Sequence, residues 1–145
     1  MKKTISRLNH LLSASTVLSQ KARLCHWNYE GFDFVDMHER FEEIYTYFSD
    51  LADVLAERIR ALDAFPKATF AEYIKTTEIK EKKTIKSDKM IQTLIKDISH
   101  ITGELRTWLK NENDVVTESI FMDTLTELEK KLWMLKSSGS KSSAK

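Results

Sequence analysis

The chain has 145 residues, of which 41% are hydrophobic and 31% charged, and its formal net charge is +1. This length suits one domain with a moderate core, and the near-neutral charge argues against a generic polyanion binder. A single cysteine, Cys25, excludes an internal disulfide framework and is typical of a reducing compartment. No apolar run approaches the ~20 residues that span a bilayer, and Met1-Lys2-Lys3 leads into polar residues rather than a signal-peptide core. We therefore expect a soluble, cytoplasmic protein with no membrane partner.

Only one proline and three glycines interrupt the chain, which favours long helices over strands. Apolar residues recur at helical spacing and predict four long helices, over residues 4–28, 34–62, 87–111 and 115–136. Asp33 is the expected N-cap of the second of these helices, and Pro66 prevents it from continuing. Beyond Pro66, Thr69 precedes Glu72 by three residues, a capping-box spacing that predicts a short helix in the connection.

Four long helices with a long middle connection describe an all-α, ferritin-like four-helix bundle. The short helix between the second and third long helices supports this fold class, because a bundle with tight turns would not need it. We expect the bundle to occupy residues 1–136. Residues 137–145 have the Ser/Lys composition of a disordered tail.

Two pairs of potential metal ligands lie on the second long helix. His38 and Glu42 are four residues apart, as are Asp53 and Glu57, so each pair shares one face over one turn. The eleven residues from Glu42 to Asp53 leave the two pairs only ~20° apart around the helix axis. The fifteen residues from His38 to Asp53, however, correspond to a rise of ~22 Å, so both pairs of one chain cannot hold one metal ion.

Three arrangements remain open: the pairs are unrelated, they bind ligands separately, or a second copy of the helix lies antiparallel against this one. In the third arrangement a twofold axis near Tyr47 and Phe48 places the histidine end of one copy opposite the acidic end of the other. His26, near the end of the first helix, returns beside His38 through a short loop. Two imidazoles and three carboxylates are a ligand set that suits iron.

The segments "HWNYEGFDFVDMHERFEEIY" and "DVLAERIRAL", with "LWML" at residues 132–135, resemble the Dps family of ferritin-like DNA-protection proteins of starved bacteria. The chain resembles in particular the neutrophil-activating-protein branch of that family, and the resemblance covers roughly residues 4–136. The resemblance implies a hollow homododecamer with ferroxidase centres, each of two iron ions, between twofold-related subunits. The ligands that it implies are His26, His38 and Glu42 from one subunit, with Asp53 and Glu57 from the other.

Many members of the family carry Asp at the position of Glu42, and the adjacent Glu43 is an alternative ligand here. The resemblance also places Trp27 near the iron, where an oxidisable ring could intercept radicals. Asp123 and Glu127 are candidates for acidic iron-entry pores at threefold axes, against the simpler interpretation of a solvated helix face. The candidates for non-specific DNA contacts are Lys2, Lys3, Lys136, Lys141 and Lys145.

The leading hypothesis is a ferroxidase that oxidises Fe(II), preferably with hydrogen peroxide, and stores ferric oxide in a cage, which protects the cell and its DNA. Its first rival is a nucleoid-associated protein whose main role is DNA binding. A second is a ferritin with the di-iron site inside one bundle, but no Glu is followed by His three residues later. A third, a purely structural bundle, would place leucines on the stripe where this chain has polar side chains.

Overall fold

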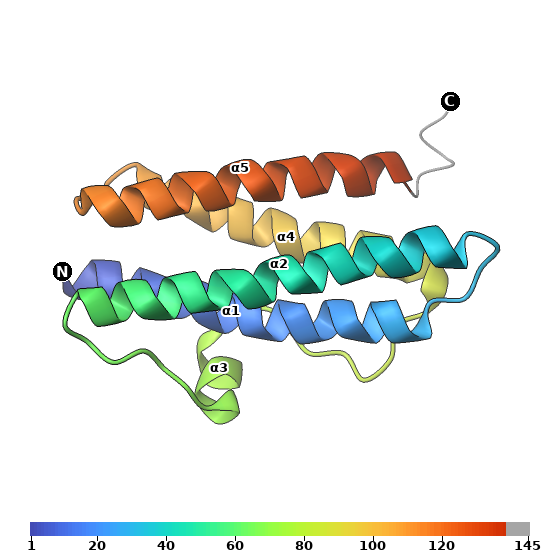
Figure 1. Cartoon of the computed structure of the whole chain (residues 1–145), viewed down its shortest axis with the longest axis horizontal. Coiled ribbons are helices and arrows are strands. Elements are labelled where there is room, and N and C mark those ends of the chain that lie inside the picture. The colour runs from blue at the N-terminus through green and yellow to red at the C-terminus, as the bar shows by residue number, and fades with distance from the viewer. Residues whose placement is uncertain (139–145) are drawn as a thin grey trace. The chain divides into compact units, whose positions relative to one another are not determined.

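A computed structural model describes residues 1–138, and all regular structure in this range is helical (Figure 1). In chain order the helices are α1 (Lys2–Asn28), α2 (Phe34–Ala61), α3 (Phe70–Thr76), α4 (Ser87–Leu109) and α5 (Val115–Ser138). The prediction of an all-α chain with a short helix between the second and third long helices is confirmed. Helix α5 continues two residues beyond its expected end, and the rest of the expected tail lies outside the described residues. No helix within residues 1–138 has the length and apolar character needed to cross a membrane.

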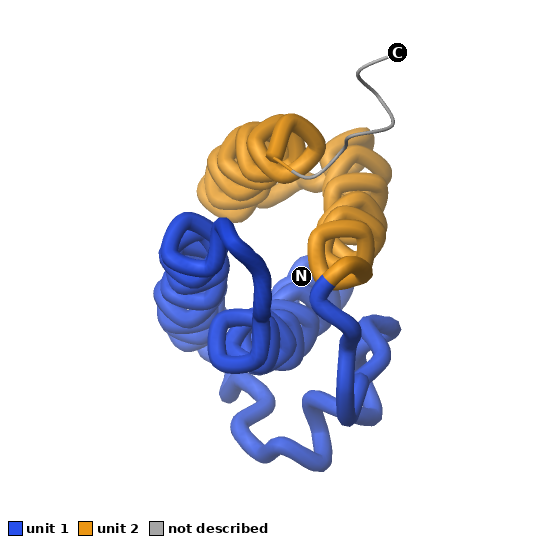
Figure 2. The backbone as a smooth tube through the Cα atoms, turned by 90° about the vertical axis from the view of Figure 1, so that its right-hand side faces the viewer, with its two compact units in different colours: residues 1–87 blue, residues 88–145 orange. Residues whose placement is uncertain are grey.

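The chain divides into two compact units, one formed by residues 1–87 and the other beginning at residue 88 (Figure 2). In the first unit α1 packs along α2. The buried residues of α2 recur every three or four positions and form one apolar stripe: Met37, Phe41, Ile44, Phe48, Leu51, Leu55 and Ile59. Helix α1 instead buries serines such as Ser13 and Ser19 as well as its leucines, and the Ser19 hydroxyl donates a hydrogen bond to the Tyr45 carbonyl of α2 at 3.0 Å. The acidic residues of α2 that lie away from its apolar stripe, among them Glu42, Asp53 and Glu57, are exposed.

Helix α2 ends at Ala61, within one residue of the end predicted ahead of Pro66. Leu62 is its C-cap, and Asp63 adopts a left-handed backbone with φ of 65°, a conformation that Asp tolerates better than most residues. Downstream, the Thr69 hydroxyl accepts a hydrogen bond from the Glu72 amide, and the Glu72 carboxylate accepts one from the Thr69 amide, both at 3.2 Å. This capping box starts α3 and lowers the pKa of Glu72, because the Thr69 hydroxyl and nearby amides stabilise the carboxylate.

The connection around α3 is fastened to α1 at both of its ends. The amide of Lys67 donates a hydrogen bond to the side-chain oxygen of Asn9 at 2.9 Å. The ammonium group of Lys21, a buried residue of α1, donates one to the carbonyl of Lys80 at 2.7 Å. These contacts explain how a long connection with one short helix keeps a defined course along α1.

The second unit contains α4 and α5. Asp114 accepts a hydrogen bond from the Thr117 amide at 2.9 Å and so caps the start of α5. Arg106 of α4 forms an ion pair with Glu129 of α5, and the rings of Trp108 and Phe121 lie 5.4 Å apart between the same two helices. Both helices bury regular apolar stripes, of which the fully buried members are Met90, Leu94, Ile98, Ile101, Leu105, Phe121 and Leu128.

Candidate metal centre

The structure brings His26 and His38 into direct contact at the junction of α1 and α2. His26 lies in the last turn of α1 and is buried, whereas His38 lies in the second turn of α2 and is partly exposed. Their imidazole rings stack with centroids 3.6 Å apart and an interplanar angle of 17°. The loop from residue 29 to residue 33 turns the chain back sharply, which places two side chains twelve residues apart against each other.

Each histidine is bonded to the backbone of the other. The Nδ1 atom of His26 lies 2.7 Å from the carbonyl oxygen of His38, and the Nδ1 atom of His38 lies 2.7 Å from the carbonyl oxygen of His26. A carbonyl oxygen can only accept, so both Nδ1 atoms must carry the proton. Each neutral imidazole then keeps its lone pair on Nε2, the form in which histidine binds a metal ion. The backbone therefore sets the tautomer of both rings before any metal binds.

Aromatic contacts hold this pair of rings in place on both sides. The ring of Phe34 stacks on His38 with centroids 4.9 Å apart, and Tyr45 meets His26 edge-on at 5.2 Å. The guanidinium of Arg23 lies over the ring of Tyr45, 4.9 Å from the ring centroid, and makes a cation–π contact with it. A metal bound at Nε2 would thus meet imidazoles whose orientation is already fixed by packing.

The three predicted carboxylate ligands have a different environment. Glu42, Asp53 and Glu57 all lie on the exposed face of α2. Glu42 and the alternative ligand Glu43 are both exposed and line the same open groove along the helix. Exposure leaves these carboxylates free of the desolvation cost that burial in a single chain would impose.

The five predicted ligands do not assemble a metal site within one chain. Among residues 1–138, no three of these five side chains bring ligand atoms within 4.8 Å of one another. The two histidines contact each other, whereas Asp53 and Glu57 lie further along α2. At 3.6 residues per turn, they are separated from His38 by four helical turns or more.

The remaining predicted residues lie at the surface wherever the structure describes them. The Trp27 side chain, next to His26, is 61% exposed. Asp123 and Glu127 are exposed one turn apart on α5. Lys2 and Lys3 are exposed in the first turn of α1, so they are part of a helix rather than a free arm, and Lys136 is exposed near the end of α5. The other two DNA-contact candidates, Lys141 and Lys145, lie outside the described residues.

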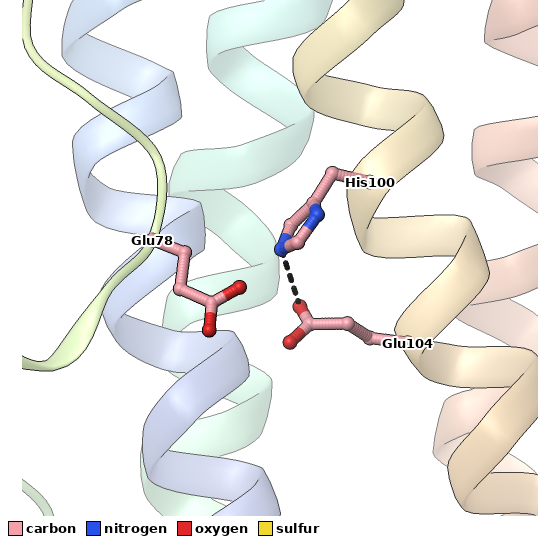
Figure 3. A group of neighbouring side chains, drawn as sticks. All are labelled: Glu78, His100 and Glu104. Atoms are coloured by element: carbon pink, nitrogen blue, oxygen red, sulfur yellow. Dashed lines mark ion pairs between the residues drawn. The ribbon is translucent and has the colours of Figure 1, made fainter.

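Two polar pairs were not predicted as sites from the sequence. The Tyr29 hydroxyl donates a hydrogen bond of 2.6 Å to Oδ1 of Asp33, and this bond to a carboxylate raises the pKa of Tyr29 to about 12. On α4, Nε2 of His100 lies 3.6 Å from a carboxylate oxygen of Glu104, one turn along the helix (Figure 3). Both pairs have i, i+4 spacing in the sequence, but that spacing is too common to identify them without coordinates.

Comparison with known proteins agrees with this architecture. The ferritin-like domain family matches residues 5–140. A DNA protection during starvation protein of Helicobacter pylori is 38% identical over 138 residues, which are 92% of this chain and 96% of that protein. The crystal structure of Dps from Staphylococcus aureus superposes on this chain with a TM-score of 0.90 at 31% sequence identity. The alignment covers 94% of this chain and 95% of the Staphylococcus aureus chain.

The crystal structure of a Dps protein from Vibrio cholerae superposes with a TM-score of 0.88 at 35% sequence identity. The alignment covers 94% of this chain and 88% of the Vibrio cholerae chain. That protein is described as a member of a broad superfamily of ferritin-like diiron-carboxylate proteins. The helices, the short connecting helix and these matches define an all-α protein with the ferritin-like fold. The chain belongs to the Dps family of ferritin-like proteins.

Proposed function

We propose that this protein is a ferroxidase that binds two Fe(II) ions at each of two equivalent sites on a twofold interface and stores the ferric product inside a dodecameric cage. His26, His38 and Glu42 of one copy would bind the iron together with Asp53 and Glu57 of the other. The observation that carries the proposal is the reciprocal pair of Nδ1–carbonyl hydrogen bonds at 2.7 Å, which leaves both Nε2 atoms as ligands.

The separation along α2 supports a site shared between copies. The ~22 Å rise from His38 to Asp53 is too long for one ion, but two antiparallel copies of α2 would bring the opposite ends together. Exposure of Glu42, Asp53 and Glu57 leaves them accessible to such a partner. A closed twofold contact of this kind necessarily forms two identical sites.

The ligand set also suits the chemistry. Three carboxylates offset most of the positive charge of two ferrous ions, and imidazole nitrogen with carboxylate oxygen is a donor mixture that iron accepts. Two Fe(II) ions held together can supply both electrons that break the O–O bond of hydrogen peroxide, so that hydroxide or water leaves and no hydroxyl radical is released. The protein contributes positions and charge balance rather than covalent chemistry.

Protection of DNA follows from this reaction, because it consumes both reactants that generate hydroxyl radicals. The curated relatives named for DNA protection during starvation are consistent with that role. Asp123 and Glu127 remain our candidates for the iron-entry route, and the lysines at both ends of the chain remain candidates for direct contact with DNA.

A complementation experiment tests the shared site. One variant carries His26→Ala with His38→Ala, the other carries Asp53→Asn with Glu57→Gln, and differently tagged copies are co-expressed so that mixed assemblies can be isolated. Each variant alone should oxidise Fe(II) only at the rate of free iron. In a mixed pair, one site combines both defects, whereas the other combines intact histidines with intact acids, so rapid oxidation should return.

The control is a mixture of the histidine variant with a chain that carries all four substitutions, which rebuilds no site. His100→Ala, on the exposed face of α4, should keep the parental rate. If isolated mixed assemblies stay as inactive as the parent variants, the ligands do not come from two copies and the proposal is wrong. Should the histidine variant fail to fold, His38→Gln, at the less buried position, replaces it.

A further inference from the structure

Three side chains of α1 meet at one residue of α2, Tyr45. Ser19, Arg23 and His26 follow one another at spacings of four and three residues, so they lie on one face of α1. The Ser19 hydroxyl donates to the Tyr45 carbonyl at 3.0 Å. The Arg23 guanidinium lies 4.9 Å from the centroid of the Tyr45 ring, and the His26 ring lies 5.2 Å from it at an interplanar angle of 75°. Tyr45 therefore fastens α2 to α1 beside the candidate metal centre.

The ring of His26 contacts two rings of α2. His38 and Tyr45 are seven residues apart, which is about two helical turns, so they lie on the same face of α2. His26 stacks on the first with centroids 3.6 Å apart and meets the second at 5.2 Å. The hydrogen bond from Nδ1 to the His38 carbonyl holds one atom of the imidazole but does not by itself fix the plane of the ring. The direction of Nε2 therefore depends on the two ring contacts as well.

Tyr45 is suited to hold the imidazole because its ring is itself held and has no other polar task. Its hydroxyl makes no hydrogen bond within residues 1–138, so its contacts with α1 side chains are those of the ring. The guanidinium over that ring adds electrostatic attraction to the packing. On the other side of the histidine pair, Phe34 covers His38, but it is the first residue of α2 and is 38% exposed. Of the two rings that flank the histidines, Tyr45 is the one with partners on both helices.

We propose that Tyr45 is a positioning residue of the metal centre, which holds the imidazole of His26 with Nε2 in the orientation that binds iron. The inference rests on the proposed function, because that function assigns His26 as a ligand. A ring that is already oriented loses less conformational freedom when an ion binds, so the contact favours binding of Fe(II) rather than the later transfer of electrons. Without the Tyr45 ring, Fe(II) binds more weakly, and the rate at saturating Fe(II) changes little.

Binding of Co(II) to the assembled protein tests this role without any oxidation. Co(II) accepts nitrogen and oxygen ligands as Fe(II) does, and its visible absorption reports the geometry of the ligands. The part of the binding that is lost in the variant with His26→Ala and His38→Ala defines the site. Tyr45→Leu should weaken that binding about tenfold, as expected when a group that orients a ligand is removed, and should alter the visible spectrum.

A conservative variant and a matched control separate positioning from general damage. Tyr45→Phe keeps the ring and loses only a hydroxyl without a hydrogen bond in the described residues, so it should restore the parental affinity and spectrum. Tyr73→Leu makes the same change on α3, where the Tyr73 hydroxyl donates to the Lys67 carbonyl at 3.0 Å, and should leave Co(II) binding unchanged. In peroxide-dependent Fe(II) oxidation, Tyr45→Leu should raise KM about tenfold and keep kcat within about twofold of the parental value.

The outcomes distinguish this inference from the proposed function. If the parent binds Co(II) through the histidines but oxidises Fe(II) no faster than free iron, the proposed function fails, and Co(II) binding by Tyr45→Leu still tests the positioning role. The inference is wrong if Tyr45→Leu keeps the parental affinity and spectrum, or if Tyr45→Phe loses as much affinity as Tyr45→Leu. A parent that binds no Co(II) through the histidines contradicts both. Should Tyr45→Leu fail to assemble, Tyr45→Met, which fills the site without a ring, is judged by the same criteria.

Discussion

The proposed ligands fall into two groups, at the junction of α1 with α2 and further along α2, and the two are organised very differently. At one end, His26 and His38 are stacked at 3.6 Å, bonded to each other's carbonyls and enclosed by aromatic rings. At the other end, Asp53 and Glu57 are exposed side chains on a helix surface. A single chain therefore fixes the orientation of the two imidazoles that we propose as ligands, and it leaves the proposed carboxylate ligands exposed to solvent.

This contrast has a physical reason. Neutral imidazoles can be buried once their N–H groups have acceptors, whereas carboxylates that are buried without a counter-charge carry a large desolvation cost. In the site that we propose, Asp53 and Glu57 would be enclosed only when a metal ion and a second copy of the chain bring positive charge and ligands to them. A site divided in this way avoids burying unpaired negative charge in the free subunit.

The largest expected effect is a loss of Fe(II) oxidation when the exposed acids Asp53 and Glu57 are replaced. Asp53→Asn with Glu57→Gln should reduce fast Fe(II) oxidation to the rate of free iron, because the proposed site loses two of its three carboxylates. The same variant should keep the free energy of unfolding of its subunit within about 0.5 kcal/mol, since both positions are exposed on the single chain and such positions contribute little. Oxidation kinetics and urea unfolding of the same preparation measure both values. A large loss of stability would show that these acids are structural.

The histidine end should respond in both measurements. His38→Ala removes one hydrogen bond and leaves the carbonyl of His26 without that donor, which should cost about 1–3 kcal/mol of unfolding free energy. It should also remove fast iron oxidation. His38→Ala could instead be inactive yet as stable as the variant with Asp53→Asn and Glu57→Gln. The reciprocal hydrogen bonds would then contribute no stability, and the histidines would not differ from the acids in this respect.

A change remote from both ends calibrates these effects. Thr69→Ala removes the hydroxyl that accepts a hydrogen bond from the Glu72 amide in the capping box of α3. Loss of such an N-cap bond typically costs about 1 kcal/mol of unfolding free energy. Thr69→Ser, which keeps the hydroxyl, should restore most of that stability. Neither change should alter the rate of iron oxidation, so a slower rate in Thr69→Ala would show that general destabilisation is sufficient to disturb the metal centre.

The smallest expected effect is a dependence of stability on pH at the loop beside the histidines. The pKa of Tyr29 is raised from 10.0 to about 12, so the folded chain binds this proton more tightly than the unfolded chain. The stabilisation is complete below pH 10 and disappears as the pH rises towards about 12. Phenolate absorbance, compared between the parent and Tyr29→Phe, measures this titration. In Asp33→Asn the pKa should fall back towards its ordinary value.

Much of the fold could be predicted from the sequence because it depends on local interactions. The spacing of apolar residues on α2 follows the helix period, and Thr69 with Glu72 forms its capping box within one turn. The meeting of His26 and His38 also follows from a short loop between two helices. The helix ends were predicted to within two residues, where the last turn of a helix frays and capping decides the boundary.

The sequence by itself thus determined the helices, their order and the family that the chain resembles, and it supplied the proposed ligands as a prediction. Only the tertiary structure decided which nitrogen of each histidine is free, because that depends on a carbonyl twelve residues away. It also decided that Tyr29 donates to Asp33 and that Arg23 covers Tyr45. Such contacts depend on how the backbone of one helix approaches the side chains of another, and residue spacing along the chain does not contain that information.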